Sequence, residues 1–157
     1  MSHRLPRIVM MEDNPADVLL IREALREQGL EVDLVVVPDG EAALAWLGGD
    51  ASADLILLDL NLPRHDGIEV LERIRSTRSL REVPVAVVSS SDSPHDRAGA
   101  ERLGADRFIA KPCTLDEFLM IGRDIKTLLA ARTPPPKEQW ERDTAQPAEG
   151  SDPNRLS

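Results

Sequence analysis

Short apolar runs, rich in β-branched residues, alternate with segments of helical pattern along most of the chain. The runs are nearly continuous, which is typical of strands that are buried on both faces of a parallel sheet. They lie at Ile8–Met11, Asp33–Val37, Leu55–Leu58, Val83–Val88 and Phe108–Ala110.

The segments between these runs carry the signals of helix ends. The first predicted helix begins at Asn14-Pro15, an N-cap followed by proline at the first helical position, and ends near Gly29. The last begins at Thr114, with Glu117 completing a capping box. The other three are expected over about residues 41–47, 67–75 and 94–104. Five strands alternating with five helices predict an α/β fold, in which helices cover both faces of a parallel sheet.

The composition changes after Arg132. Residues 133–157 contain five of the twelve prolines and few aliphatic residues. We therefore expect one domain over residues 1–132 and a disordered, proline-rich polar tail over residues 133–157. Trp140 is the one residue of this tail that is suited to dock on the domain or on a partner.

Charge and hydropathy exclude several classes of protein. The formal net charge of −9 argues against nucleic acid as a direct partner, because phosphate backbones need basic surfaces. No apolar run approaches the roughly 18 residues that span a membrane, and the N-terminus is too short and polar for a secretory signal. A cytoplasmic protein without membrane contact is expected. The single cysteine, Cys113, excludes an intrachain disulfide.

Polar side chains stand directly after four of the predicted strands. Because the carboxyl ends of parallel strands meet at one edge of the sheet, these residues should converge there. They are Glu12 and Asp13 after the first strand, Asp59 and Asn61 after the third, Ser89 after the fourth and Lys111 after the fifth. Each of them alone is common in solvated loops, so the prediction depends on their joint occurrence.

The chemistry of this set points to phosphoryl transfer. Two carboxylates about 5 Å apart repel each other by roughly 3 kcal/mol at an effective dielectric constant near 20, and a hard divalent cation relieves that repulsion. Oxygen ligands without a nearby His/Cys cluster favour Mg²⁺. With Lys111 adding a fixed positive charge, such a site is suited to receive a phosphoryl group on a carboxylate.

Residues 7–131 resemble the receiver domains of two-component response regulators. The matching segments are Met11–Asn14, Leu57–Pro63, Asp66-Gly67, Ser89, Gly104–Asp106 and Lys111-Pro112. The resemblance implies a flavodoxin-like, doubly wound five-stranded parallel sheet with strand order 2-1-3-4-5. It also implies that a histidine kinase donates the phosphoryl group to Asp59, so that the protein is a phosphoacceptor switch rather than an enzyme.

The same resemblance assigns roles to single residues. The Mg²⁺ ligands would be Asp13, Asp59 and the backbone carbonyl of Asn61, with Glu12 acting through water. Lys111 and Ser89 would contact the phosphoryl group, and Ser89 would form the conformational switch with Phe108. The bond between Lys111 and Pro112 would be cis.

A narrower resemblance comes from two runs, Glu12–Asp17 and Asn61–Gly67, and from the long link over residues 75–84. These segments are similar to the small receivers paired with phytochrome histidine kinases of bacteria and cyanobacteria. A phytochrome kinase is therefore the expected phosphoryl donor.

Two other functions remain open on this pattern. A phosphatase of the haloacid dehalogenase class also uses an aspartyl nucleophile and Mg²⁺, but it needs a second Asp where this chain has Asn61. A flavin or nucleotide carrier on the same fold would need a phosphate-binding loop after the first strand, where Glu12 and Asp13 would repel a phosphate.

The last predicted helix and the fifth strand bear on how the chain associates. Arg107 and Ile121 replace charges through which DNA-binding relatives often pair, an acidic residue and an arginine respectively. The apolar residues Met120 and Ile121 instead predict a homodimer through the last helix. A wider stripe of core residues on that helix is the alternative.

Overall fold

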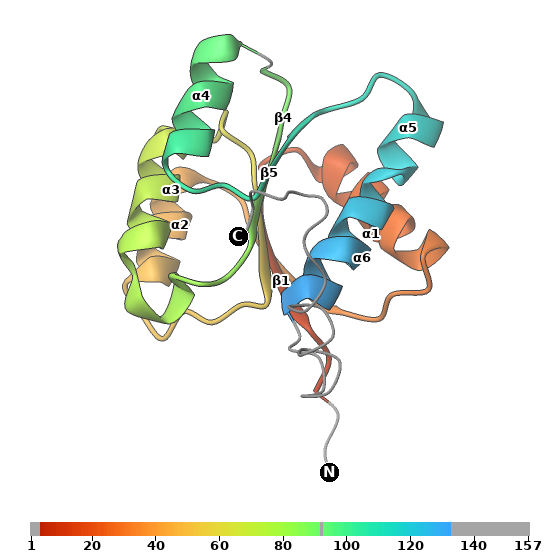
Figure 1. Ribbon diagram of the computed structural model, residues 1–157, viewed down its shortest axis with the longest axis horizontal. Coiled ribbons are helices and arrows are strands. Elements are labelled where there is room, and N and C mark those ends of the chain that lie inside the picture. The colour runs from red at the N-terminus through yellow and green to blue at the C-terminus, as the bar shows by residue number, and fades with distance from the viewer. Residues whose placement is uncertain (1–3, 92, 133–157) are drawn as a thin grey trace, which may run out of the picture.

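Five parallel strands form one sheet in the order β2-β1-β3-β4-β5. This arrangement comes from a computed structural model that describes residues 4–91 and 93–132 (Figure 1). The strands are β1 Arg7–Met11, β2 Asp33–Val37, β3 Leu55–Leu58, β4 Val85–Ser89 and β5 Arg107–Ala110. The predicted flavodoxin-like α/β fold and its strand order are confirmed.

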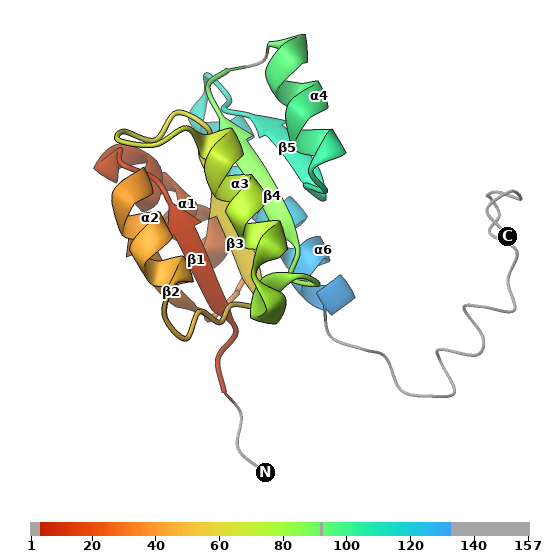
Figure 2. The ribbon, with the colours of Figure 1, turned by 90° about the vertical axis from the view of Figure 1, so that its left-hand side faces the viewer.

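Helices cover both faces of this sheet, with α2, α3 and α4 on one side and α1, α5 and α6 on the other (Figures 1 and 2). The helices are α1 Pro15–Glu27, α2 Gly40–Leu47, α3 Gly67–Ser76, α4 Pro94–Arg102, α5 Leu115–Leu119 and α6 Ile121–Arg132, and a 3₁₀ turn, η1, spans Arg78–Leu80.

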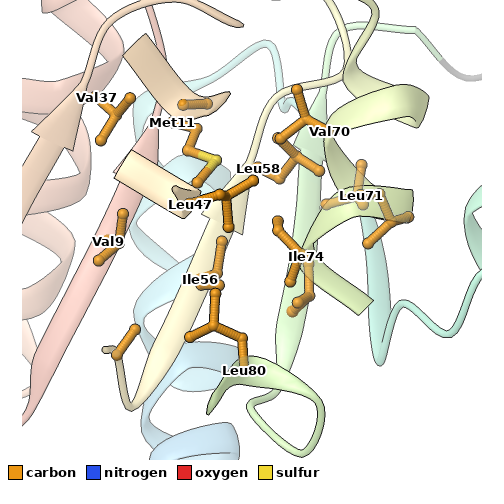
Figure 3. Close-up of a cluster of buried hydrophobic side chains, with 14 of the residues drawn as sticks. Val9, Met11, Val37, Leu47, Ile56, Leu58, Val70, Leu71, Ile74 and Leu80 are labelled. Carbon is orange, nitrogen blue, oxygen red and sulfur yellow. The ribbon is translucent and has the colours of Figure 1, made fainter. Parts of the chain in front are cut away.

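Alternate residues of the central strands lie in two separate hydrophobic cores, one on each face of the sheet. Val9 and Met11 of β1 belong to the cluster on the side of α2 and α3, which also contains Leu47 and Ile74 (Figure 3). Ile8 and Met10 point the other way and pack with the α1, α5 and α6 side chains. Burying one such side chain contributes about 1.5–3 kcal/mol. Occupation of both faces explains why the strands appear as continuous apolar runs.

The predicted helix ends have the expected local chemistry. Asn14 Oδ1 accepts a hydrogen bond from Ala16 N at 2.9 Å, and Thr114 Oγ1 accepts one from Glu117 N at 3.2 Å. Gly29 follows α1 with a φ of 67°, a left-handed conformation that glycine adopts without a steric cost. Strand β4 begins two residues later than predicted, after Pro84, which has no N–H to donate to a ladder.

The last helix differs from the prediction. It is divided at Met120 into α5 and α6, and Ile121 is only 2% exposed, within the core that contains Phe118 and Ile125. The interpretation of Ile121 as a surface residue is therefore wrong, and the wider core stripe is correct for Ile121 but not for Met120, which is 47% exposed. The physical reason is a close approach to α1, because a Cβ on Gly122 would lie 2.5 Å from Ala24 O.

Two expectations concern other parts of the chain. The tail predicted over residues 133–157, including Trp140, lies outside the described residues. Across residues 4–91 and 93–132, no helix combines the length and the apolarity that crossing a membrane requires.

Candidate functional site

The register of the sheet brings the predicted polar residues to one edge. Strands β1 and β3 are neighbours, with Met11 opposite Leu58, so Glu12 and Asp59 follow side by side. Asp59 N donates to Met11 O at 3.0 Å. Strands β4 and β5 are also neighbours, and Lys111 N donates to Ser89 O at 2.8 Å. The convergence predicted from a parallel sheet is what the structure shows.

Three carboxylates gather at the ends of β1 and β3. Glu12, Asp13 and Asp59 each offer an oxygen atom, and these atoms lie within 4.8 Å of one another. Glu12 and Asp59 are buried, at 3% and 4% exposure, whereas Asp13 is exposed. Hard oxygen ligands, two of them shielded from solvent, fit a divalent cation of the Mg²⁺ type.

Lys111 supplies the positive charge that faces these acids. Its Nζ lies 2.9 Å from Glu12 Oε1 and 2.9 Å from Asp59 Oδ2. A third contact, at 2.6 Å, joins Lys111 Nζ to Asp17 Oδ2, in the first turn of α1. Asp17 is not among the residues predicted for the site, because its side chain comes from a helix and not from a strand end. The available signal was an acidic residue one turn after the Asn14 N-cap.

Burial and charge shift the titration of two of these groups. Burial raises the pKa of Glu12 from its ordinary 4.5 to about 7, with the charge of Asp59 adding to the effect and a hydrogen bond from Lys111 opposing it. Burial lowers the pKa of Lys111, but hydrogen bonds to Asp17, Glu12 and Asp59 outweigh it and leave that pKa above its ordinary value. Lys111 is therefore charged at neutral pH, whereas the charge of Glu12 is costly there.

Asn61 and Ser89 border the buried carboxylate of Asp59. Asn61 N donates to Asp59 Oδ1 at 2.9 Å, which folds the loop after β3 around this carboxylate. The Asn61 side-chain amide donates to Ser90 Oγ at 3.1 Å and to Ser89 Oγ at 3.4 Å. Ser89 is fully buried, and its Oγ also accepts from Ser91 N at 3.2 Å.

Phe108 lies on β5, away from the acids. Its ring is half-buried, and the guanidinium of Arg97 from α4 lies 4.6 Å from the ring centroid. Val87 is the partner of Phe108 in the ladder, and Ser89 is the partner of Ala110. The two predicted switch residues are thus on neighbouring strands, two positions apart in the ladder.

One detail of the loop after β5 differs from the expectation. The bond between Lys111 and Pro112 is trans and not cis. The trans isomer is the favoured one for an X–Pro bond, by about 0.5–1 kcal/mol.

Known proteins share this fold and are similar in sequence. The family model for the response regulator receiver domain matches residues 8–121. The response regulator Rcp1 of Synechocystis sp. is 32% identical over 126 residues, which cover 76% of this chain and 86% of Rcp1. A crystal structure of its Mn²⁺-bound form superimposes with a TM-score of 0.71 and 32% identity, covering 78% of this chain and 92% of that one.

Two further structures are similar. That of the phosphorylated cyanobacterial phytochrome response regulator RcpA is 35% identical, with a TM-score of 0.74, and covers 85% of this chain and 99% of its own. The receiver domain of the sensor histidine kinase PA1611 from Pseudomonas aeruginosa, with a magnesium ion in its active site cleft, is 28% identical, with a TM-score of 0.61 and coverage of 76% and 95%. Sequence and fold agree, and the chain belongs to the receiver domain family of response regulators.

Proposed function

We propose that Asp59 accepts a phosphoryl group from a sensor histidine kinase. The observation that supports this proposal is the environment of its carboxylate, which is 4% exposed and lies beside two other acids and Lys111. This receiver would be a switch that is modified on its own side chain, without a separate substrate to turn over.

The chemical step is a displacement at phosphorus. An oxygen of the Asp59 carboxylate attacks the phosphorus of a phosphohistidine, the P–N bond breaks, and an acyl phosphate forms as the imidazole leaves with the electron pair. Lys111, whose Nζ is 2.9 Å from Asp59 Oδ2, can direct an N–H to a phosphoryl oxygen. The Ser89 hydroxyl can donate to another, since Ser89 is buried at the same edge.

Mg²⁺ is the cation proposed for the acidic cluster. Asp13 and Asp59 would be direct ligands, with the backbone carbonyl of Asn61, and Glu12 would bind through water. A bound Mg²⁺ would supply charge neutralisation for the carboxylates and for the transferring oxygens. The three converging carboxylates support this assignment, as do the Mn²⁺ and Mg²⁺ ions named in the structures of Rcp1 and of the PA1611 receiver.

The proposed partner is a phytochrome histidine kinase in the cytoplasm. The similarity to RcpA, a phytochrome response regulator, supports it. A kinase would present its phosphohistidine at the carboxyl edge of the sheet, where Asp13 is exposed and Asp59 lies behind it.

Output would follow from a shift of Ser89 and Phe108. A phosphoryl group that bonds Ser89 draws the loop after β4 inward, and Phe108 then moves into the space that this loop vacates. The surface formed by α4, β5 and α5 would change with it. We propose a homodimer through the exposed apolar side chains at α5, Leu115 and Met120, which are 56% and 47% exposed. Ile121 is buried and would not take part in this interface.

Acetyl phosphate with Mg²⁺ distinguishes the three functions. A receiver gains one labile phosphoryl group per chain, a phosphatase hydrolyses the donor over many turnovers, and a flavodoxin-like carrier does neither. Asn61 at the position of the phosphatase's second Asp, with its amide bonded to Ser90, argues for the first outcome. Sustained turnover of the donor, or no labelling in the presence of Mg²⁺, would overturn the proposal.

A further inference from the structure

Among the partners that Lys111 has in the described part of the chain, Asp17 is the one to which the proposed function assigns no role. Its Oδ2 lies 2.6 Å from Lys111 Nζ, compared with 2.9 Å for each of the oxygens of Glu12 and Asp59. The two side chains are largely shielded, at 13% exposure for Lys111 and 14% for Asp17. The contact is therefore too enclosed to be treated as a surface ion pair.

The backbone positions of both Asp17 and Lys111 are fixed by local structure. Asn14 caps α1 through Ala16 N and Pro15 opens the helix, which fixes Asp17 in its first turn. Lys111 is held by its own N–H, which donates to Ser89 O at 2.8 Å. The pair thus joins the start of α1 to the residue that follows β5.

We propose that Asp17 changes two affinities of the site in opposite directions. It strengthens the binding of the divalent cation and weakens the interaction of the site with the phosphoryl group on Asp59. This inference rests on the proposed function of Asp59. It makes Asp17 a positioning residue that acts through Lys111 and through its own charge.

The hydrogen-bond capacity of Lys111 is fully used in this structure. An ammonium group has three N–H donors, and Asp17, Glu12 and Asp59 take one each. A phosphoryl oxygen must therefore compete for a donor, and Asp17, whose carboxylate makes the shortest of the three contacts, is one of its competitors.

Charge acts in the same direction. With Asp17 included, the site holds four carboxylates and one ammonium, and the fourth negative charge attracts a divalent cation while it repels a phosphoryl dianion. Removing only this charge should therefore shift the two affinities in opposite directions. A purely structural role, as an anchor for Lys111 or a favourable charge at the start of α1, would instead make both affinities fall together.

The experiment measures the two affinities separately. Isothermal titration gives the Mg²⁺ affinity, and a titration with beryllofluoride at saturating Mg²⁺ reports the affinity for a phosphoryl-like group on Asp59. For Asp17→Asn we expect Mg²⁺ to bind about fivefold more weakly and beryllofluoride about fivefold more tightly than in the wild type.

Three matched variants complete the design. Asp17→Glu keeps the charge and should stay within about twofold of the wild type in both titrations. Glu27→Gln makes the same change of net charge at an exposed position of α1 and should leave both affinities unchanged. Asp13→Asn removes a proposed ligand and should weaken Mg²⁺ binding.

Only opposite shifts in Asp17→Asn support the inference. Parallel losses would make Asp17 a structural anchor, and unchanged affinity in either titration would remove its tuning role; each result overturns the proposal. A wild type that binds no beryllofluoride would overturn the proposed function as well, so the two failures are distinguishable.

Discussion

At the scale of single residues, Glu12 makes the site sensitive to pH. Its folded-state pKa is about 7, above its ordinary 4.5, so the folded protein holds this proton more tightly than the unfolded chain does. The stability that this difference provides is present below about pH 4.5 and is lost as the pH rises through about 7. Above that range the ionised Glu12 destabilises the cation-free protein.

Glu12→Gln should remove the decrease in unfolding free energy that accompanies the ionisation of Glu12. In the absence of divalent cations, we expect the wild type to lose about 1–3 kcal/mol of unfolding free energy between pH 5 and pH 8 relative to this variant. Urea unfolding of both proteins at the two pH values measures the difference. Parallel pH profiles for wild type and variant would contradict the assignment of the shifted group.

The sequence was sufficient to predict most of the site, for a reason that is specific to these residues. Glu12, Asp59 and Lys111 each follow a strand directly, and a parallel sheet fixes where strand ends lie. Asp17 could not be found in this way, because its approach to Lys111 depends on how α1 packs. The trans bond at Pro112 likewise could not be read from the family pattern.

At the scale of elements, α1 and α6 approach each other closely at Gly122. Gly122→Ala should destabilise the domain, because the added Cβ would lie 2.5 Å from Ala24 O and 2.9 Å from Gln28 Cγ. We expect a loss of about 1–3 kcal/mol, as is typical of overpacking.

Gly48→Ala is the matched control for this substitution. Gly48 has a φ of −80°, and a Cβ there would have its nearest neighbours at 3.6 Å, an ordinary contact. Chemical denaturation should show little change or a small gain for this control. Equal stability of the two variants would contradict the close packing of α1 against α6.

The contact between Arg97 and Phe108 links α4 to the proposed switch residue and should restrain the movement of its ring. A cation–π contact at 4.6 Å is worth about 0.5–1 kcal/mol, and its loss in Arg97→Ala should free Phe108 to move inward. Phosphorylation by acetyl phosphate should then be about two- to fivefold faster, since the competent state is more populated. Arg102→Ala, an exposed position of the same helix, should retain the wild-type rate. An unchanged or slower rate in Arg97→Ala would show that this contact does not restrain the switch.

Elements were predicted well where the apolar pattern alone defines them, and less well where tertiary contacts do. The bounds of β2 and β3 agree with the prediction, because their apolar runs are flanked by polar or turn residues on both sides. The division at Met120 was not predicted, since a continuous helical pattern carries through it. The close approach of Gly122 to α1 was not predicted either, since it depends on how the two helices pack.

At the scale of the whole molecule, the described domain contains every proposed site residue. Truncation after Arg132 should therefore leave the rate of phosphorylation by acetyl phosphate unchanged. The reason is that Glu12, Asp13, Asp59 and Lys111 are all supplied by the strand ends within residues 4–132. Comparing initial rates of the full and truncated chains checks this, and a large loss would assign a supporting role to the tail.

The most direct test of the central claim is to locate the phosphoryl group itself. After incubation with acetyl phosphate and Mg²⁺, mass spectrometry of wild type, Asp59→Asn and Asp66→Asn should show one phosphoryl group on the first and third and none on the second. Asp66 is a fair control, because it caps α3 through Ile68 N at 3.1 Å and lies outside the acidic cluster. A full phosphoryl signal on Asp59→Asn, or a modified peptide that does not contain Asp59 in the wild type, would contradict the account.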